Sequence, residues 1–436
     1  MYPLAQRCSL YSWPCPDPLK LDSKLDRCVM CGMCSPHCPT YALSLDENES
    51  PRGRIALISA YLKGELALDE RLMGHLDHCL ACRACEHYCP SAVAFGRIMD
   101  ETRVLLESRR HRPWHTRLLR NWALETIANK QRLRRVFRLL SRYQRWGIQS
   151  VLRGSGLLHL LGLAGVEKQL PVIPEMRPWH DYYPPRTSAR GNVALFTGCL
   201  NEPLGQAGLD SAIRVLNVLG YGVYVPAAQG CCGALHRHNG DPGQAAQLAR
   251  QNLAAFAKLE VEAILHTATG CTAALAEYAD LPGLSEEMRG QAQRFAAKVS
   301  DINQFLCDAA WPDEVRCEPL PQRVAVHTPC SQVHVLRQGD TPLRLLQRIP
   351  KLDLVELIDN ERCCGGAGSY LLTQPAWSER LRQPKIAHLE ELGAHTLVTS
   401  NIGCALHLQA GLRARGMDIE VCHPVELLAR QLGATS

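Results

Sequence analysis

Hydrophobic residues near the start of the chain recur at the spacing of one helix face. Residues 51–66 have apolar side chains at Ile55, Ile58, Leu62 and Leu66. This 3.6-residue period predicts an amphipathic helix. Residues 67–80 have the pattern of a second helix. We therefore expect an α-helical domain over residues 1–100.

A basic amphipathic segment follows this domain. Between residues 115 and 146 one helical face is apolar and arginines lie opposite. The apolar positions are Leu118, Leu119, Trp122, Leu133, Val136, Phe137, Leu140 and Tyr143. Residues 101–190 contain 18 Lys or Arg against 6 Asp or Glu. Residues 174–191 are rich in proline and polar residues, which is typical of a linker.

Beyond residue 190 short apolar strands alternate with helices, and the pattern occurs twice. The string VALFTGC at 193–199 returns as VAVHTPC at 324–330, and the Cys-Cys-Gly at 231 returns at 363. Self-similarity at a nearly constant offset indicates an internal duplication. Strands alternating with helices predict a parallel sheet in each repeat, with ligands at the carboxyl ends of the strands.

The expected fold class is therefore mixed, with an α-helical domain followed by two duplicated α/β domains that contain parallel sheets. The expected boundaries are 1–100 for the helical domain, 101–190 for the basic connector and linker, 191–320 for the first repeat and 321–436 for the second. A chain of 436 residues has room for several domains, because a single core seldom exceeds about 300 residues.

Composition is that of a globular protein and excludes several classes. The chain is 46% hydrophobic and 21% charged, which excludes a disordered chain. No apolar stretch reaches the roughly 20 residues that a membrane-spanning helix needs. The first residues contain prolines where a signal peptide has an uninterrupted apolar region. We therefore expect a cytoplasmic protein.

Cysteine carries the candidate chemistry, with 21 residues in the chain. Two runs have the spacing C-x2-C-x2-C-x3-C-P: Cys28, Cys31, Cys34 and Cys38, then Cys79, Cys82, Cys85 and Cys89. This spacing is the bacterial ferredoxin signature for 4Fe-4S clusters, in which the fourth cysteine of each run ligates the other cluster. The predicted ligand sets are Cys28, Cys31, Cys34 and Cys89 for one cluster, and Cys79, Cys82, Cys85 and Cys38 for the other.

The first 100 residues are thus expected to form an α-helical ferredoxin domain. Pro39 and Pro90, which follow the two runs, can each open a helix, because the missing N–H would be unsatisfied there in any residue. Zinc is the alternative metal, since paired cysteines also build zinc ribbons, but four-ligand zinc sites would stretch each run. A disulfide scaffold is disfavoured, because such scaffolds are small and secreted.

Eight further cysteines lie at the ends of predicted strands in the two repeats. They are Cys199, Cys231, Cys232 and Cys271 in the first repeat, and Cys330, Cys363, Cys364 and Cys404 in the second. Successive side chains point apart unless the backbone turns sharply, and the following glycine permits that turn. Adjacent thiolates suit a multi-iron cluster with several metal corners. A zinc site and a redox-active thiol pair remain open.

Long strings of the sequence resemble one protein family. CVMCGMCSPHCPTY, PRGRIALI, QGCCGALHRHNGD and CCGGAGSYLLTQP resemble the iron-sulfur subunit of bacterial glycolate oxidase, and the resemblance runs from about residue 28 to 432. More distantly, the chain resembles the C subunit of anaerobic glycerol-3-phosphate dehydrogenase and the CCG subunit of heterodisulfide reductase. The resemblance implies an electron-transfer subunit whose partner subunit holds FAD and oxidises a 2-hydroxy acid such as glycolate or D-lactate.

The two CCG domains depart from the heterodisulfide reductase pattern. Ala274 and His407 stand where that pattern has one more cysteine, which leaves four thiols per repeat. This departure argues against heterodisulfide chemistry. His407, His327 or His423 could complete a ligand set, although a histidine beside a cluster more often donates a hydrogen bond that tunes its potential.

Other chemistry has no motif to support it. The chain lacks the spacing of G-x-G-x-x-G after a strand, of a P-loop, of G-x-S-x-G and of H-E-x-x-H. No nucleic-acid-reading motif accompanies the basic connector. Three interpretations of the connector remain open: a helix that packs on the ferredoxin domain, a docking face for an acidic flavoprotein, or a patch that adsorbs to an anionic membrane surface.

We therefore expect the iron-sulfur subunit of a flavin-dependent 2-hydroxy-acid dehydrogenase, of the glycolate oxidase type, which relays electrons from a partner FAD subunit towards a quinone. No catalytic residue is assigned to this chain. Alternatives are a subunit that serves D-lactate or glycerol 3-phosphate, a thiol or disulfide reductase whose CCG centre does the chemistry, and a metal-stabilised scaffold. The expected location is the cytoplasm, or the inner face of the plasma membrane if the connector adsorbs there.

Overall fold

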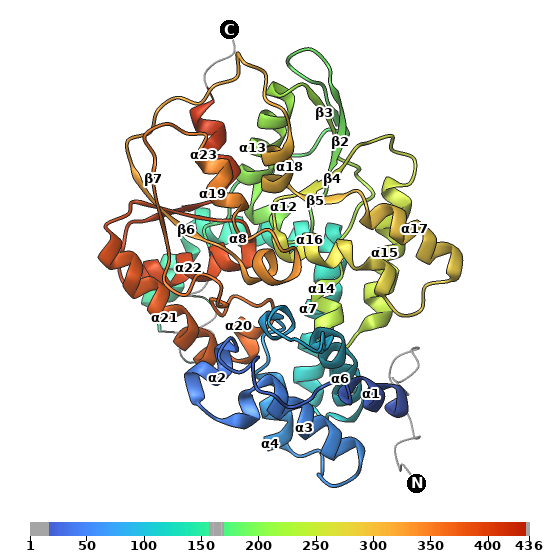
Figure 1. Ribbon diagram of the computed structural model, residues 1–436. Helices are drawn as coiled ribbons and strands as arrows, with labels where there is room; N and C mark the ends of the chain where they lie inside the picture. Colours follow the sequence, from blue (N-terminus) through green and yellow to red (C-terminus); the bar gives the residue numbers. More distant parts are fainter. Residues whose placement is uncertain (1–16, 157–159, 161–166, 168–169, 433–436) are drawn as a thin grey trace.

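The computed structural model describes residues 17–156, 160, 167 and 170–432. In Figure 1 the N-terminal helical domain lies below two α/β units that stand side by side. This arrangement agrees with the fold class expected from the sequence. In the part of the chain that the structure describes, none of the helices is long and apolar enough to cross a membrane.

Short helices wrapped around a compact core form the N-terminal domain. They are α1 (Pro18–Leu25), α2 (Pro39–Ser44), the 3-10 helix η1 (Glu47–Glu49), α3 (Pro51–Leu62), α4 (Glu70–Asp77), α5 (Ala84–His87) and α6 (Phe95–Arg109). The two helices predicted from hydrophobic spacing are confirmed as α3 and α4. Pro39 opens α2 as expected. Pro90 does not open a helix, because a turn follows it and α6 begins at Phe95.

The basic connector includes the helices α7 (Trp114–Ala128), α8 (Lys130–Arg145) and α9 (Ile148–Gly154). Asn129 ends α7 and caps α8 by accepting a hydrogen bond from the Arg132 N–H at 3.0 Å. The single apolar face predicted across this segment is therefore divided between two helices. Leu118 and Leu119 of α7 are 59% and 65% exposed.

The interpretation that the connector packs on the ferredoxin domain is wrong for α8. Leu133 and Phe137 are buried and pack against Leu200 and Leu204 of the first repeat. Lys130 and Arg134 also pair with Glu202 of that repeat, at 2.6 and 2.5 Å. The apolar face of α8 is therefore occupied by the first CCG domain.

The first repeat forms a five-stranded sheet in the order β1-β3-β2-β4-β5. Its strands are β1 (Tyr182–Tyr183), β2 (Gly191–Leu195), β3 (Tyr221–Tyr224), β4 (Ile264–His266) and β5 (Val299–Asp301). Its helices are α12 (Asn201–Leu204), α13 (Gln206–Val218), α14 (Ala234–His238), α15 (Pro242–Phe256), α16 (Thr269–Ala276), the 3-10 helix η2 (Tyr278–Asp280), α17 (Glu286–Ala296) and α18 (Ile302–Asp308). The pairing is parallel except for β1, which the predicted linker contributes as an antiparallel edge strand.

The second repeat forms a four-stranded parallel sheet in the order β7-β6-β8-β9. Its strands are β6 (Arg323–His327), β7 (Asp353–Glu356), β8 (Thr396–Thr399) and β9 (Glu420–Cys422). Its helices are the π-helix η3 (Ser331–Val335), α19 (Thr341–Leu346), α20 (Tyr370–Thr373), α21 (Pro375–Leu392), α22 (Ile402–Ala414) and α23 (Pro424–Gln431). The order matches the first sheet without β1, which confirms the duplication.

One hydrophobic core joins the two repeats. Val193 and Leu216 of the first repeat belong to the same buried cluster as Val326 and Leu428 of the second. Helix α13 packs directly against α23 across this boundary. The repeats are therefore fused through their interiors, and their carboxyl-terminal strand ends are fixed relative to each other.

The helical domain contacts both repeats through polar groups. Asp100 accepts a hydrogen bond from Arg237 Nε at 2.6 Å, and Arg237 also donates to Glu277 at 2.8 Å. Glu277 pairs in addition with Arg83 of the helical domain. On the other side, Arg380 donates to the Leu43 carbonyl at 2.8 Å. These contacts hold the helical domain against the loops that carry the repeat cysteines.

We predict that Glu277→Gln weakens this docking. Burial alone would raise the pKa of Glu277, but the charges of Arg83 and Arg237 outweigh burial and lower it. The pairing therefore stabilises the fold above the unfolded pKa of about 4.3 and is lost as the pH falls through the lower folded value. At pH 7 we expect the free energy of unfolding to fall by about 2 kcal/mol. This value lies between the losses that are typical of exposed ion pairs and of buried ion pairs.

Urea denaturation of the cluster-loaded protein measures this effect. The control is Glu390→Gln, because Glu390 is 63% exposed and pairs with Arg415 on the surface. It should cost less than about 1 kcal/mol. Equal losses in the two variants would contradict a specific role for the Glu277 contacts.

Candidate metal centres

The two ferredoxin-type runs fold into loops of the same shape. Met30 and Gly32 in the first loop have φ values of 56° and 80°, and Ala81 and Arg83 have 53° and 61° at the matching positions of the second. Left-handed backbone is costly for residues other than glycine, and it persists where the surroundings enforce it. The repeated conformation wraps each C-x2-C-x2-C segment around one point.

The second loop forms a cavity together with the last cysteine of the first run. Cys38 lines this cavity with Cys79, Cys82 and Cys85. Its other walls include Leu80, Phe95 and Met99. Four thiols around one apolar cavity are the donor set that a 4Fe-4S cluster requires, so the residues present fit such a group. Cys38 reaches it from the N-cap of α2.

The remaining cysteines of the two runs also lie against the helical core. Cys28, Cys34 and Cys89 pack against the same buried cluster, which includes Leu21, Leu25 and Phe95, and Cys31 is exposed. Burial raises the pKa of the Cys34 thiol, and the neighbouring Cys28 and Cys38 add to the effect. This set is more open to solvent than the set around Cys38.

A buried ion network beside Cys38 was not foreseen from the sequence. Arg54 is 1% exposed and donates to Glu49 Oε2 at 2.6 Å and to Thr40 Oγ1 at 3.1 Å. Its Nη1 lies 3.9 Å from Cys38 Sγ. His75 and His78 approach the other oxygen of Glu49, at 2.7 and 2.8 Å. The one sequence signal for this network was the PRGR string. Its second arginine directly precedes Ile55, a residue predicted to face the core.

Each CCG repeat brings its four cysteines together. In the first repeat Cys231 Sγ lies 3.4 Å from Cys199 Sγ. The glycine after each cysteine pair has left-handed backbone, with φ of 84° at Gly233 and 90° at Gly365. A Cβ on Gly365 would lie 2.6 Å from the Ser378 carbonyl oxygen. The sharp turn expected from Cys-Cys-Gly is therefore present in both repeats.

The second cysteine of each pair is the centre of its thiol group. The thiols of Cys231 and Cys271 donate to Cys232 and lower its pKa well below the ordinary value. Cys363 and Cys404 lower the pKa of Cys364 in the same way. In both repeats a buried thiolate is thus favoured at the same position, which suits metal binding, because the thiolate is the ligand form.

A buried histidine accompanies each of these thiolates, from different strands in the two repeats. In the second repeat His327 lies at the end of β6, and its ring groups with Cys364 and Cys404. In the first repeat that position is Phe196, and His266 at the end of β4 lies near Cys232 instead. Neither His327 Nε2 nor the two His266 ring nitrogens has a hydrogen-bond partner of normal geometry.

The other two histidines considered as ligands have different surroundings. His407 Nε2 lies 3.2 Å from both the hydroxyl and the carbonyl of Ser378. His423 caps α23, with Nδ1 accepting from the Val425 N–H at 3.1 Å. His327 is therefore the histidine of the three that the structure groups with cysteines.

The Cys38 cavity and the second CCG site are neighbours. Leu80 and Cys82 pack in one apolar cluster with Cys330, Cys363 and Tyr370. The pKa of the Cys82 thiol is raised well above its ordinary value by burial and then by Cys330. The two thiol groups thus share one apolar interface. A charge that arrives at either group would act directly on the other.

Three family models match four parts of the chain. A 4Fe-4S dicluster domain matches residues 24–93, and a cysteine-rich domain matches residues 193–276 and again 324–409. The linker region of the glycolate oxidase iron-sulfur subunit matches residues 115–170. Fold and cysteine sites thus define a dicluster iron-sulfur protein with two cysteine-rich domains.

Relatives cover nearly the whole chain. The probable glycolate oxidase iron-sulfur subunit of Bacillus subtilis is 32% identical over 421 residues, 94% of this chain and 95% of that protein. The glycolate oxidase iron-sulfur subunit of Escherichia coli is 32% identical over 428 residues, 95% of this chain and 96% of that protein. The chain belongs to the glycolate oxidase iron-sulfur subunit family.

Two further proteins share part of the chain or its fold. Lactate utilization protein A of Geobacillus kaustophilus is 32% identical over 236 residues, which is 54% of this chain and 98% of that protein. The crystal structure of a hypothetical protein from Helicobacter pylori superposes with a TM-score of 0.51 at 13% identity, covering 88% of this chain and 68% of that chain. The second likeness shows the fold alone.

We predict that Arg54→Met destabilises the fold much more than Arg52→Met, although both arginines belong to the PRGR string. Arg54→Met leaves the buried carboxylate of Glu49 without its guanidinium, which typically costs about 3 kcal/mol. Arg52 pairs with Glu47 at 2.6 Å, with side chains 36% and 46% exposed, so Arg52→Met should cost less than about 1 kcal/mol. Urea unfolding followed by circular dichroism measures both, and similar midpoints would disprove the buried network's importance.

Proposed function

We propose that this chain is the iron-sulfur electron-transfer subunit of a flavin-dependent 2-hydroxy-acid dehydrogenase complex, with glycolate as the first candidate substrate. The observation that carries the proposal is the apolar interface that Cys82 shares with Cys330 and Cys363. It brings the ferredoxin domain into direct apolar contact with a CCG site. The family membership supports the type of complex.

We further propose the ligand sets that the run spacing predicts. Cys79, Cys82, Cys85 and Cys38 would hold one 4Fe-4S cluster, and Cys28, Cys31, Cys34 and Cys89 the other. The cavity lined by the first four cysteines supports the exchange of fourth cysteines between the runs. When bound, such clusters accept and release single electrons at potentials set by charge, hydrogen bonds and exposure.

The four thiols of each CCG repeat would hold one or two further centres, iron-sulfur or zinc. Cys199, Cys231, Cys232 and Cys271 form the first set, and Cys330, Cys363, Cys364 and Cys404 the second. The left-handed glycine after each cysteine pair and the favoured thiolates at Cys232 and Cys364 support metal binding at both. Neighbouring backbone N–H groups, such as that of Gly233 at 3.4 Å from Cys231 Sγ, would stabilise negative charge there.

Oxidation of the hydroxy acid is assigned to a partner subunit that carries FAD. This chain contains no nucleotide-binding fingerprint in its sequence. The final acceptor would be a quinone, and the complex would lie in the cytoplasm or on the inner face of the plasma membrane. Exposed Trp114, Trp122 and Trp146 in the basic connector support contact with a membrane surface or with the partner.

D-lactate is the second candidate substrate. The relatives named lactate utilization protein A match over about half of this chain. Purification of the chain with its partner, followed by addition of glycolate or D-lactate under argon, decides between the two. Bleaching of the flavin absorbance by one acid and not by the other identifies the substrate.

We predict that Cys82→Ser separates the two halves of the reaction. Turnover with a dye that oxidises the flavin directly should survive, because the substrate site lies on the partner. Quinone reduction should fall at least about a hundredfold, because the relay between the two thiol groups is interrupted. Cys317→Ser is the matched control, since Cys317 lies outside the four predicted sets. Equal loss of dye and quinone activities in Cys82→Ser would contradict the assignment of substrate oxidation to the partner and of electron relay to this chain.

Variants at the fourth cysteine of each run test whether the two runs exchange these ligands. Cys38→Ser should alter the same electron paramagnetic resonance signal as Cys85→Ser, because the two cysteines line one cavity. Cys89→Ser should alter the other signal. The assignment is wrong if Cys38→Ser and Cys34→Ser perturb one and the same signal while Cys85→Ser leaves it unchanged.

A further inference from the structure

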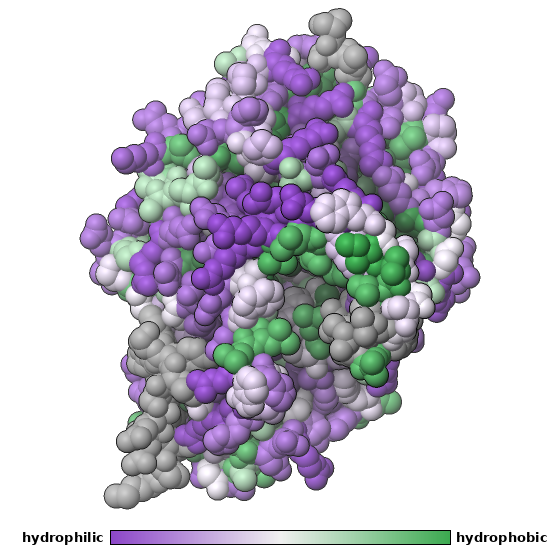
Figure 2. All heavy atoms as spheres, turned by 180° about the vertical axis from the view of Figure 1, so that it is seen from behind, coloured by the Kyte–Doolittle hydropathy of each residue, from purple (hydrophilic) through white to green (hydrophobic). Residues whose placement is uncertain are grey.

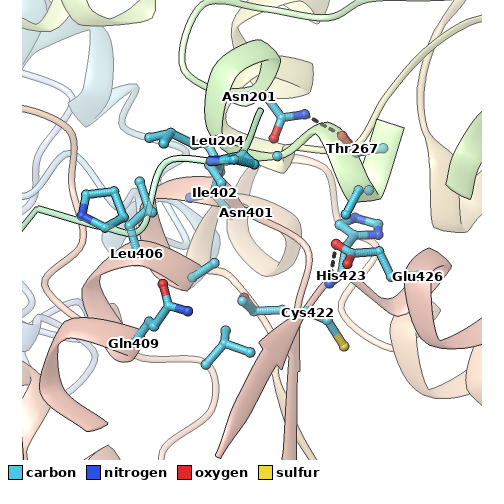
Figure 3. A pocket seen from close by; sticks show the side chains of 18 of the residues that line it. Asn201, Leu204, Thr267, Asn401, Ile402, Leu406, Gln409, Cys422, His423 and Glu426 are labelled. Atoms are coloured by element: carbon cyan, nitrogen blue, oxygen red, sulfur yellow. Dashed lines mark hydrogen bonds between the residues drawn. The ribbon is translucent and has the colours of Figure 1, made fainter. Parts of the chain in front are cut away.

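A cavity of about 290 Å³ lies between the two CCG repeats. Figure 3 shows its walls, with Asn201 and Thr267 from the first repeat facing Leu406 and His423 from the second. It opens at the carboxyl ends of β4, β8 and β9, where parallel α/β sheets bind ligands. The size suits a ligand of one or two rings.

The chemistry of the wall selects a neutral ligand. Leu204, Ile402 and Leu406 supply apolar contact, and Asn201, Asn401 and Gln409 supply amides. Among the described residues that line the cavity there is no lysine or arginine, and Glu426 contributes an acid. A carboxylate or phosphate would therefore find no counter-charge. A flat ring with carbonyl acceptors fits both the apolar and the amide groups.

His423 lines the cavity but presents no donor to it. Its Nδ1 accepts from the Val425 N–H at 3.1 Å, so the neutral ring carries its proton on Nε2. Nε2 is buried and lacks a hydrogen-bond partner of normal geometry, although the Thr267 carbonyl lies near the ring. Burial, followed by the nearby His266, lowers the pKa of His423 to about 3. The ring is thus neutral at physiological pH.

The cavity wall touches both cysteine sites. Asn401 donates to Cys404 Sγ at 3.4 Å, and its Oδ1 accepts from the Gly270 N–H, next to Cys271, at 3.4 Å. Thr399 Oγ1 lies 2.9 Å from His327 Nδ1. A ligand in the cavity would therefore be separated from either thiol group by little more than one side chain.

The mouth of the cavity continues onto an apolar surface. Pro171 and Val172 line the mouth, and Val172 is 79% exposed. Gln144 at the end of α8 holds this segment, donating to the Pro171 carbonyl at 2.8 Å. Trp146 follows, 71% exposed. Figure 2 shows hydrophobic residues gathered around a hollow on the face seen from behind Figure 1. A hydrocarbon tail that leaves the cavity beside Val172 would meet this exposed apolar side chain.

We propose that this cavity binds the ring of a quinone, with the side-chain amides of Asn401 and Gln409 donating to the ring carbonyls. The proposal rests on the proposed function, because it names where the acceptor of that relay binds. Apolar side chains of α12 and α22 would hold the ring, and Pro171 and Val172 would direct its tail outwards.

The reaction balances without a further reagent. Oxidation of the hydroxy acid to the oxo acid on the partner releases two electrons and two protons. Reduction of the quinone to the quinol consumes two electrons, which the proposed relay supplies, and two protons, which come from water. Glu426, whose pKa burial raises, is a carboxyl of the cavity wall at which a proton from water could be held.

The test uses the cluster-loaded complex with its flavoprotein partner. Leu406→Trp fills the cavity, and Gln409→Leu removes one of the donating amides while it leaves a side chain of similar size. Each should weaken binding of decylubiquinone, measured by equilibrium dialysis of the oxidised complex, by about tenfold or more. The ratio of quinone to dye turnover should fall by a similar factor. The controls are Ala414→Trp and Gln347→Leu, at exposed positions of the same repeat.

An azidoquinone probe gives an answer that needs no variant. Photolabelling of the unmodified complex should mark peptides that contain residues 399–409 or 421–426. Labelling confined to other peptides, or an unchanged dissociation constant in Leu406→Trp with full iron content, overturns the cavity assignment. A complex that binds decylubiquinone in the cavity but reduces neither dye nor quinone with any hydroxy acid would instead overturn the proposed function and leave the binding site in place.

Discussion

The N-terminal domain depends on one contact: Cys38, the last cysteine of the first run, lies in the cavity formed by the second run. It fixes α2 beside the second cysteine loop. Arg54 then joins the surrounding helices, donating to Thr40 on α2, to Glu49 and to the His75 carbonyl on α4 at 2.8 Å. Because these groups are buried, each one needs its partner, so the network resists rearrangement. The same packing presents Leu80 and Cys82 to the second repeat.

The sequence predicted what depends on local spacing. The runs of cysteines, the helices α3 and α4, the alternating strands and helices and the duplication all follow from periods and strings that neighbouring residues define. The turn after each cysteine pair also follows, because glycine tolerates the left-handed backbone of Gly233 and Gly365. The break between α7 and α8 at Asn129 could have been predicted, since asparagine is a strong helix cap. The apolar spacing continued across it and concealed it.

Contacts between distant parts of the chain were beyond such reasoning. No local pattern indicates that Tyr370 packs beside Leu80, or that α8 covers Leu200 and Leu204. The aligned repeats show that Phe196 in the first repeat and His327 in the second occupy equivalent strand ends. The meaning of this difference required the structure, which places His266 where it compensates. The two thiol groups therefore have unequal surroundings, since His327 is fixed by Thr399 while both nitrogens of the His266 ring lack partners.

The common interior of the repeats has a consequence for how the protein can move. Val193 and Val326 belong to one cluster, and α13 lies against α23, so a hinge between the halves would have to expose that interior to water. Redox proteins whose carriers sit on separately tethered modules depend on swinging motions to bring donor and acceptor within tunnelling range. Here the shared interior fixes the spacing between the two thiol groups, so electron exchange between centres bound there would not need a domain motion.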